Sequence, residues 1–286
     1  MRPEEKSCVV TLTCEDRPGI VHAVTGVLLD HGCNITRSSQ HEDNASNQFQ
    51  MRIRFDVPGT FDPAGFQDCF RSVAARFGMA WNFFDETVRP RVLLMVSKFD
   101  HCLHDLLYRQ AIGELRMDIP LIVSNHPDCE PLAQHFGIPY KHLPVDKTNK
   151  AAQEAILLEL VDELEIDLVV LARYMQILSD PTCRALEGRA INIHHSFLPS
   201  FKGAKPYHQA HARGVKLIGA TAHFVTSDLD EGPIIEQDIQ RIDHSYSATQ
   251  CVEVGRDIER LVLARAVRWF VERKILLSGN RTIVFS

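Results

Sequence analysis

The residue types best suited to chemistry lie in two short stretches in the second half of the chain. One stretch holds Asn192 and His194, and the other holds Asp230. Asn192 and His194 are two residues apart, so an extended backbone points both side chains to the same side. An amide, an imidazole and a carboxylate at one point can polarise a small carbonyl, move a proton and direct a nucleophile. The pattern therefore predicts chemistry on a one-carbon formyl group.

These side chains are expected at the end of a strand. Ile191 and Ile193 alternate with them and would point into a core, and Leu198-Pro199 turns the chain into a loop. Ligands of open α/β sheets bind at strand ends. Singly, each residue also has a structural explanation, as a turn asparagine, a core histidine or an aspartate before glycine. Their combination in one α/β frame favours catalysis.

A doubly wound, mostly parallel sheet is expected for residues 89–286. Continuous apolar strands such as 92–96 and 168–171 alternate with helical segments, which is typical of parallel α/β folds. The same reasoning predicts further strands near 121–123, 140–143, 190–193, 218–225 and 234–239, and helices over 103–115, 131–136, 149–164 and 248–274.

A smaller domain is expected for residues 1–88. The order of patterns is strand, helix, strand, strand, helix, strand, with strands at 34–39, 48–55 and 80–84, a hairpin tip at 44–47 and a helix at 63–77. This is the ferredoxin-like βαββαβ order. Pro90, flanked by arginines, marks the boundary between the domains.

Composition excludes several classes of protein. The net charge of −6 over 286 residues leaves no basic stripe for nucleic acid or a membrane surface, and no apolar run is long enough to span a bilayer. The eight cysteines form no Cys-x-x-Cys pair, so a reducing compartment, the cytoplasm, is expected. Four histidines match no common metal-site spacing, and no metal is predicted: His195, His208, His211 and His223.

Three motifs together resemble the formyltetrahydrofolate-using family that includes glycinamide ribonucleotide formyltransferase. They are Asn192-x-His194-x-Ser196-x-Leu198-Pro199, His223-Phe224-Val225 and Asp230-x-Gly232-Pro233-Ile234-Ile235. Within that family the chain is most similar to the deformylases. The resemblance implies an ACT domain followed by a formyltransferase-like domain. It also implies hydrolysis of 10-formyltetrahydrofolate to tetrahydrofolate and formate, which would feed one-carbon and purine metabolism. The folate is then the substrate, and no cofactor is required.

The resemblance also implies a role for each polar residue. Asn192 would donate to the formyl oxygen, and His194 would hydrogen-bond the developing oxyanion or move protons. Asp230 would position water and relay a proton to N10 of the folate. His195 replaces a proline familiar from the transferases and would help to handle water.

The stretch from Leu171 to Leu178 resembles the pterin-binding loop of the transferases, although Arg173 replaces the small residue usual there. An apolar wall beside a few backbone groups suits a flat heterocycle. The alternative is a strand that runs into an ordinary helix start. The expected folate contacts are Met175, Ile177 and Leu178, with Thr226, Ser227 and Asp228 from a second stretch.

The segment Ser97 to Leu103 indicates water rather than a phosphorylated amine as the acceptor. Ribonucleotide formyltransferases carry a glycine-rich turn here that binds phosphate, whereas this chain has no glycine and carries Phe99 and Asp100. The segment resembles that of the deformylases. Three alternatives stay open. They are transfer to a small amine such as glycinamide ribonucleotide, transfer to initiator tRNA, for which a basic carboxyl-terminal module is lacking, and a non-catalytic folate-sensing regulator.

The amino-terminal domain carries the marks of a regulatory module. Asp16, Gly19 and Asn34 lie in segments that resemble ACT domains, which often bind amino-acid effectors. A purely structural role in self-association needs the same glycine, because Gly19 ends an element in either case. ACT domains commonly pair, so a homo-oligomer is expected.

Overall fold

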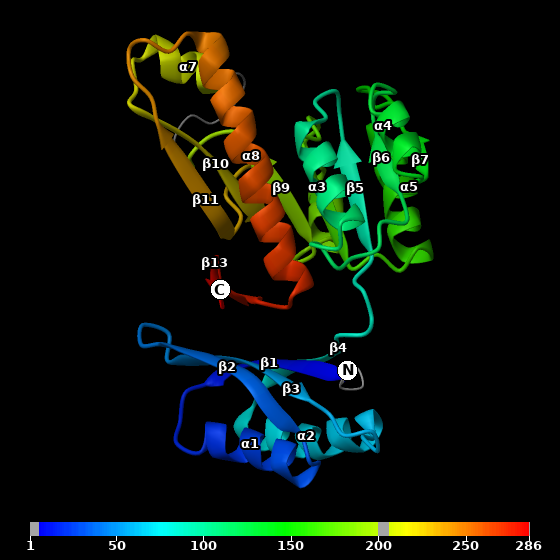
Figure 1. Cartoon of the computed structure of the whole chain (residues 1–286), viewed down its shortest axis with the longest axis vertical. Helices are drawn as coiled ribbons and strands as arrows, with labels where there is room; N and C mark the ends of the chain where they lie inside the picture. The colour runs from blue at the N-terminus through cyan, green and yellow to red at the C-terminus, as the bar shows by residue number, and fades with distance from the viewer. Residues whose placement is uncertain (1–5, 200–205, 286) are drawn as a thin grey trace. The chain divides into compact units, whose positions relative to one another are not determined.

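Two compact units make up the chain in the computed structural model, which describes residues 6–199 and 206–285 (Figure 1). The first unit contains the residues up to Arg89, together with the short segments Arg273–Leu276 and Ile283 onward. The second contains Pro90–Glu272 and Leu277–Thr282.

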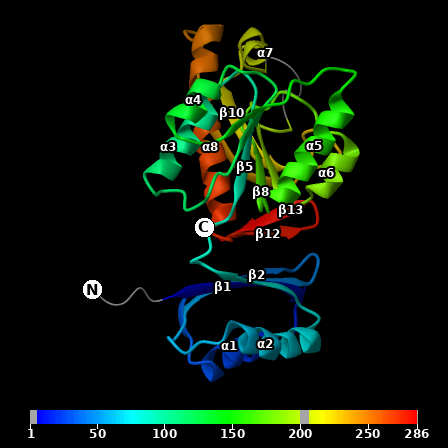
Figure 2. The same ribbon diagram turned by 90° about the vertical axis from the view of Figure 1, so that its right-hand side faces the viewer.

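The first unit has the predicted βαββαβ order. Its elements are β1 (Ser7–Glu15), α1 (Ile20–Asp30), β2 (Asn34–Asp43), β3 (Gln48–Asp56), α2 (Pro63–Phe77) and β4 (Ala80–Asp85). The strands form an antiparallel sheet in the order β2-β3-β1-β4, and both helices cover one face of it (Figure 2). The ferredoxin-like prediction is confirmed.

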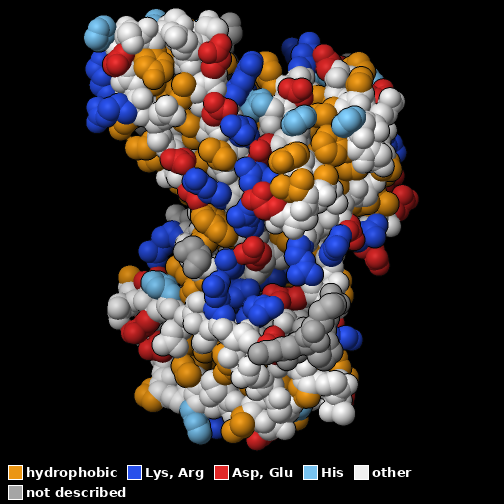
Figure 3. All heavy atoms as spheres, viewed as in Figure 1, with side chains coloured by type: hydrophobic (Ala, Val, Ile, Leu, Met, Phe, Trp, Pro, Cys, Tyr) orange, Lys and Arg blue, Asp and Glu red, His pale blue; other side chains and the backbone are white. Residues whose placement is uncertain are grey.

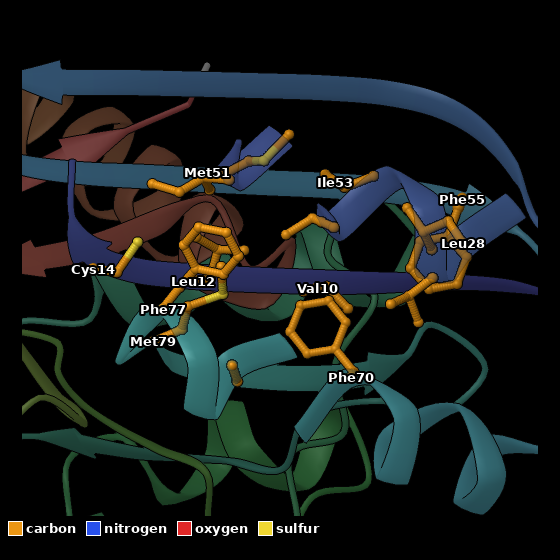
Figure 4. Close-up of a cluster of buried hydrophobic side chains, with 14 of the residues drawn as sticks. Val10, Leu12, Cys14, Leu28, Met51, Ile53, Phe55, Phe70, Phe77 and Met79 are labelled. Carbon is orange, nitrogen blue, oxygen red and sulfur yellow. The ribbon is translucent and has the colours of Figure 1, made fainter. Parts of the chain in front are cut away.

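Alternation along the strands builds the core of this unit. Val10 and Leu12 of β1, and Met51, Ile53 and Phe55 of β3, are buried against the helices (Figure 4). Strand β2 is longer than the predicted 34–39 and runs to Asp43. It is an edge strand whose side chains are mostly exposed and polar, so no hydrophobic alternation marked its full length.

The second unit is a seven-stranded sheet in the order β11-β10-β9-β8-β5-β6-β7. Five neighbouring strands are parallel, β10 pairs antiparallel with β9 at the edge of these five, and β11 pairs antiparallel with β10. The strands are β5 (Val92–Val96), β6 (Ile122–Ser124), β7 (Tyr140–His142), β8 (Leu168–Leu171), β9 (Ala190–His194), β10 (Leu217–Phe224) and β11 (Ile234–Arg241).

Helices cover both faces of this sheet (Figure 2), as a doubly wound fold requires. They are α3 (His101–Ala111), α4 (Glu130–His135), α5 (Lys150–Glu163), α6 (Asp180–Ala185), α7 (Pro206–Ala212) and α8 (Ala248–Val271). The longest, α8, packs against α3 and against β9, β10 and β11. Acidic and basic side chains lie interspersed on the face of this unit seen in Figure 3.

Several elements differ from the predicted ones. Helix α3 ends at Ala111, before the predicted residue 115, and α8 ends at Val271. Helices α6 and α7 and the hairpin of β12 (Ile275–Ser278) and β13 (Arg281–Val284) were not predicted, because neither helix completes two turns and each strand of the hairpin is only four residues long. Among the described residues, no helix is both long enough and apolar enough to cross a membrane.

Candidate active site

The three residues predicted to act together line one cavity. Asn192 and His194 lie on β9, and Asp230 lies on the loop between β10 and β11. The cavity has a volume of about 260 Å³. His194 Nδ1 lies 3.2 Å from Asp230 Oδ1, and the His194 side chain is only 5% exposed. The second ring nitrogen, Nε2, has no hydrogen-bond partner among the described residues.

His223 orients the Asn192 amide, a role that the sequence reasoning missed. It lies directly across from Asn192 in the β9–β10 pair. His223 Nδ1 donates to the Phe224 carbonyl (2.9 Å), so Nε2 carries the lone pair that accepts from Asn192 Nδ2 (3.2 Å). Burial lowers the pKa of His223, which keeps this neutral tautomer. The register of β10 against β9 could have revealed the pairing, but the sequence alone does not fix register.

The loop that carries Asp230 is held by backbone contacts. The Phe224 N–H donates to the Pro233 carbonyl (2.9 Å), and Gly232 packs so tightly on β10 that a Cβ there would overlap the Phe224 carbonyl oxygen. Asp230 itself has φ of 58°, in the left-handed region that non-glycine residues rarely adopt. This strained loop brings the carboxylate to within 3.8 Å of His223 Nε2 as well as to His194.

The surroundings in the cavity lower the pKa values of both Asp230 and His195. Burial raises the pKa of Asp230, but the hydrogen bond and charge of His194, with the charges of His223 and His195, outweigh burial and lower it overall. Burial, reinforced by the Arg173 charge, lowers the pKa of His195 to about 3. At neutral pH the cavity therefore holds a carboxylate and a neutral His195, whose ring stacks on His194 at 5.2 Å between centroids.

Five of the six predicted folate residues line the same cavity. Met175, Ile177 and Leu178 form one wall, and Thr226 and Ser227 lie on another. Asp228 is not among the lining residues, and its carbonyl accepts from the Thr226 hydroxyl (3.1 Å). The first wall is fixed by the residue that follows β5, because the Met175 N–H donates to Ser97 Oγ (2.9 Å), which in turn donates to Asn125 Oδ1 (2.6 Å).

The four histidines grouped by sequence separate in space. His195 and His223 line the cavity, whereas His208 and His211 lie exposed on α7 and do not. The spacing of the four histidines in the sequence did not distinguish the two that line the cavity from the two that are exposed.

A second charged cluster surrounds Glu259 and includes Arg173, which also lines the cavity. Glu259 of α8 accepts from His101 Nε2 (2.7 Å) and from the Tyr207 hydroxyl (2.8 Å), and its Oε2 lies 3.4 Å from Arg173 Nε. His101, Cys102 and Glu259 bring potential metal ligands within 4.8 Å of one another. They do not suit a cation, because the Arg173 guanidinium already neutralises Glu259 and burial holds the pKa of the Cys102 thiol well above its usual value.

The segment between β5 and α3 carries no glycine, and Phe99 there is 44% exposed. The guanidinium groups of Arg173 and Arg256 lie 5.6 Å and 5.5 Å from its ring centroid. A bulky ring thus occupies the strand-to-helix turn.

The residues predicted to bind an effector lie in the first unit. The Asp16 N–H donates to the Asn47 carbonyl (2.9 Å), Gly19 precedes α1 with φ of 95°, and Asn34 is exposed at the start of β2. The positive φ explains the glycine without any ligand.

Comparison with known proteins places this geometry in a family. Residues 90–267 match the formyl transferase model and residues 9–74 the ACT domain model. The chain is 48% identical over 284 residues to the formyltetrahydrofolate deformylase of Corynebacterium sp. (strain P-1), covering 98% of this chain and 99% of that relative. It is 46% identical to the Bacillus subtilis deformylase, covering 96% and 92%. The chain belongs to the formyltetrahydrofolate deformylase family.

Solved structures agree with this membership. The crystal structure of the Burkholderia mallei deformylase superposes with a TM-score of 0.94 at 53% identity, covering 98% of this chain and 100% of that one. The glycinamide ribonucleotide transformylase 1 of Symbiobacterium toebii gives only 0.66 at 28% identity, covering 72% and 98%. The chain is thus far more similar to a deformylase than to this transferase.

Proposed function

We propose that this chain hydrolyses 10-formyltetrahydrofolate to tetrahydrofolate and formate, with water as the only acceptor. The observation that carries the proposal is the His194–Asp230 pair beside Asn192 in one cavity, in a chain that belongs to the deformylase family. The substrate is itself a folate.

Asn192 polarises the formyl group. One N–H of its amide is taken by His223 Nε2, which leaves the other N–H for the formyl oxygen. Because that oxygen becomes an anion when water attacks, a donor already fixed in place stabilises the transition state more than the substrate.

We assign the proton transfer to His194 rather than to Asp230. A carboxylate whose pKa is held below its usual range is a weak base, whereas His194 has an unpartnered Nε2. Asp230 accepts the Nδ1 proton and so presents the Nε2 lone pair to water.

The water oxygen bonds to the formyl carbon while Nε2 takes its proton, and the same proton passes to N10 as the carbon–nitrogen bond breaks. The carbon leaves as formic acid, which ionises to formate. Neutral His195 can hydrogen-bond the attacking water, since the pKa of its ring lies near 3. The folate ring lies against Met175, Ile177 and Leu178, with Thr226 and Ser227 supplying backbone groups.

The main alternative is formyl transfer to a small amine such as glycinamide ribonucleotide. Phe99 in place of a glycine-rich turn disfavours a phosphorylated acceptor. The test is formate release by the purified chain from 10-formyltetrahydrofolate alone, repeated with glycinamide ribonucleotide present. We expect the same rate in both, and a rate that requires the amine would refute the proposal.

We further propose that residues 1–88 regulate a catalytic domain formed by 89–286. Asp16, Gly19 and Asn34 would contact an amino-acid effector, in a homo-oligomer paired through its ACT domains. All eight cysteines are free, which suits the cytoplasm. Activity measured with each amino acid in turn tests the effector, and no change with any of them would leave the domain a structural role.

A further inference from the structure

A buried arginine shares the catalytic cavity. Arg173 follows β8, is 9% exposed, and lines the cavity together with Asn192 and His194. Its Nη1 and Nε have no hydrogen-bond partner among the described residues. A buried guanidinium N–H without an acceptor is destabilising. Nε faces Glu259 Oε2 at 3.4 Å, so Nη1 is the donor that points to a ligand.

Glu259 holds the guanidinium in place from behind. Its carboxylate is fixed by hydrogen bonds from His101 and Tyr207. The Tyr207 ring packs so closely on Gly255 of α8 that a Cβ at that glycine would overlap the ring. Burial raises the pKa of Glu259, but the His101 hydrogen bond and the Arg173 charge lower it overall. Arg173 is therefore tethered to an ionised group on one side, while Nη1 is left for a second anion.

The backbone of Arg173 is held in an unfavourable conformation. Its φ is 64°, in the left-handed region, and its carbonyl accepts from the Ser97 N–H at 3.3 Å. Non-glycine residues keep such a conformation only where their surroundings impose it. The loop thus presents this side chain to the cavity at a cost in stability.

We propose that Arg173 binds the carboxylate of the product formate. The inference rests on the proposed function, because only hydrolysis turns the formyl group into an anion, whereas transfer to an amine yields a neutral amide. A carboxylate formed in a buried cavity needs a charged donor. His195 cannot provide that charge at neutral pH, because burial and Arg173 itself keep its ring neutral.

Binding of sodium formate to the resting full-length chain tests the proposal without turnover. Saturation-transfer NMR on the formate proton gives the dissociation constant, with sodium chloride holding the ionic strength. We expect Arg173→Gln to weaken binding by at least about tenfold, the effect of losing one charged hydrogen bond. Arg256→Gln is the matched control, because Arg256 lies over the same Phe99 ring but does not line the cavity, and it should bind formate as the wild type does.

A second variant distinguishes a loss of formate binding from misfolding. Arg173→Gln leaves Glu259 buried without its cation, so the double variant Arg173→Gln, Glu259→Gln removes both charges and should show the same loss of formate binding. The glutamyl tail of folate also carries carboxylates, and free glutamate at the same concentration should not displace formate. Displacement by glutamate, equal binding in the Arg173 variants, or no formate binding to the wild type would each overturn the proposal.

The outcomes separate this inference from the proposed function. If the chain releases formate from the folate but its Arg173 variants bind formate normally, the proposed function stands and the proposed formate site at Arg173 is wrong. If the chain binds formate through Arg173 but releases none from the folate, the proposed function is wrong and the formate site stands.

Discussion

Acid should destabilise the second unit through His195. In the folded chain burial and Arg173 lower the pKa of this ring from its ordinary 6.5 to about 3. Between these two values the unfolded chain binds a proton that the folded chain does not, so the free energy of unfolding falls as the pH drops. For one such group the loss from about pH 7 to about pH 5 is about 2 kcal/mol. Because the ring is partly exposed, we expect between about 1 and 2 kcal/mol.

The assay is urea unfolding followed by the fluorescence of Trp269 on α8. The chain has two tryptophans, so a Trp81→Phe background makes Trp269 the only indole and reports on the second unit alone. In the His195→Gln variant the free energy of unfolding should fall by about 1 to 2 kcal/mol less on acidification than in its parent. His211→Gln, at an exposed position on α7, should lose as much stability on acidification as its parent. If His195→Gln loses as much stability on acidification as its parent, the pKa of His195 is not lowered by its surroundings and the reasoning fails.

Three further predictions concern the cavity. Asn192→Ala should lower kcat for formate release by ~10²–10³ with little change in KM, because its amide acts on the developing oxyanion, and an equal rise in KM would instead indicate ground-state binding. Gly232→Ala should destabilise the second unit by about 1–3 kcal/mol in urea unfolding, because its Cβ meets the Phe224 carbonyl, and unchanged stability would show that the loop relaxes. Ser97→Ala should raise KM for the folate by about threefold to tenfold and leave kcat nearly unchanged, because it frees the Met175 N–H, and a fall in kcat alone would contradict that role.

Much of the fold was predictable because its strands are marked by strong patterns. The apolar runs 92–96 and 168–171 became β5 and β8 with the predicted bounds, and the helix over 63–77 was predicted to the residue. That helix begins with Asp62 as its cap and ends at Gly78 with φ of 64°, two signals that are local in sequence.

The parts that escaped prediction depend on contacts between distant residues. His223 reaches Asn192 only through the antiparallel pairing of β10 with β9. Glu259 reaches Arg173 and His101 only because α8 packs on α3. An acidic residue inside an amphipathic helix is ordinarily a surface residue, so nothing in its local sequence distinguished Glu259.

The most direct test of water as the acceptor is a turnover in ¹⁸O-labelled water without any amine. The account predicts that each formate released carries one solvent oxygen, and that Asp230→Asn still binds the folate but loses most of this labelled product. Unlabelled formate, release only after an amine is added, or full turnover by Asp230→Asn would contradict it.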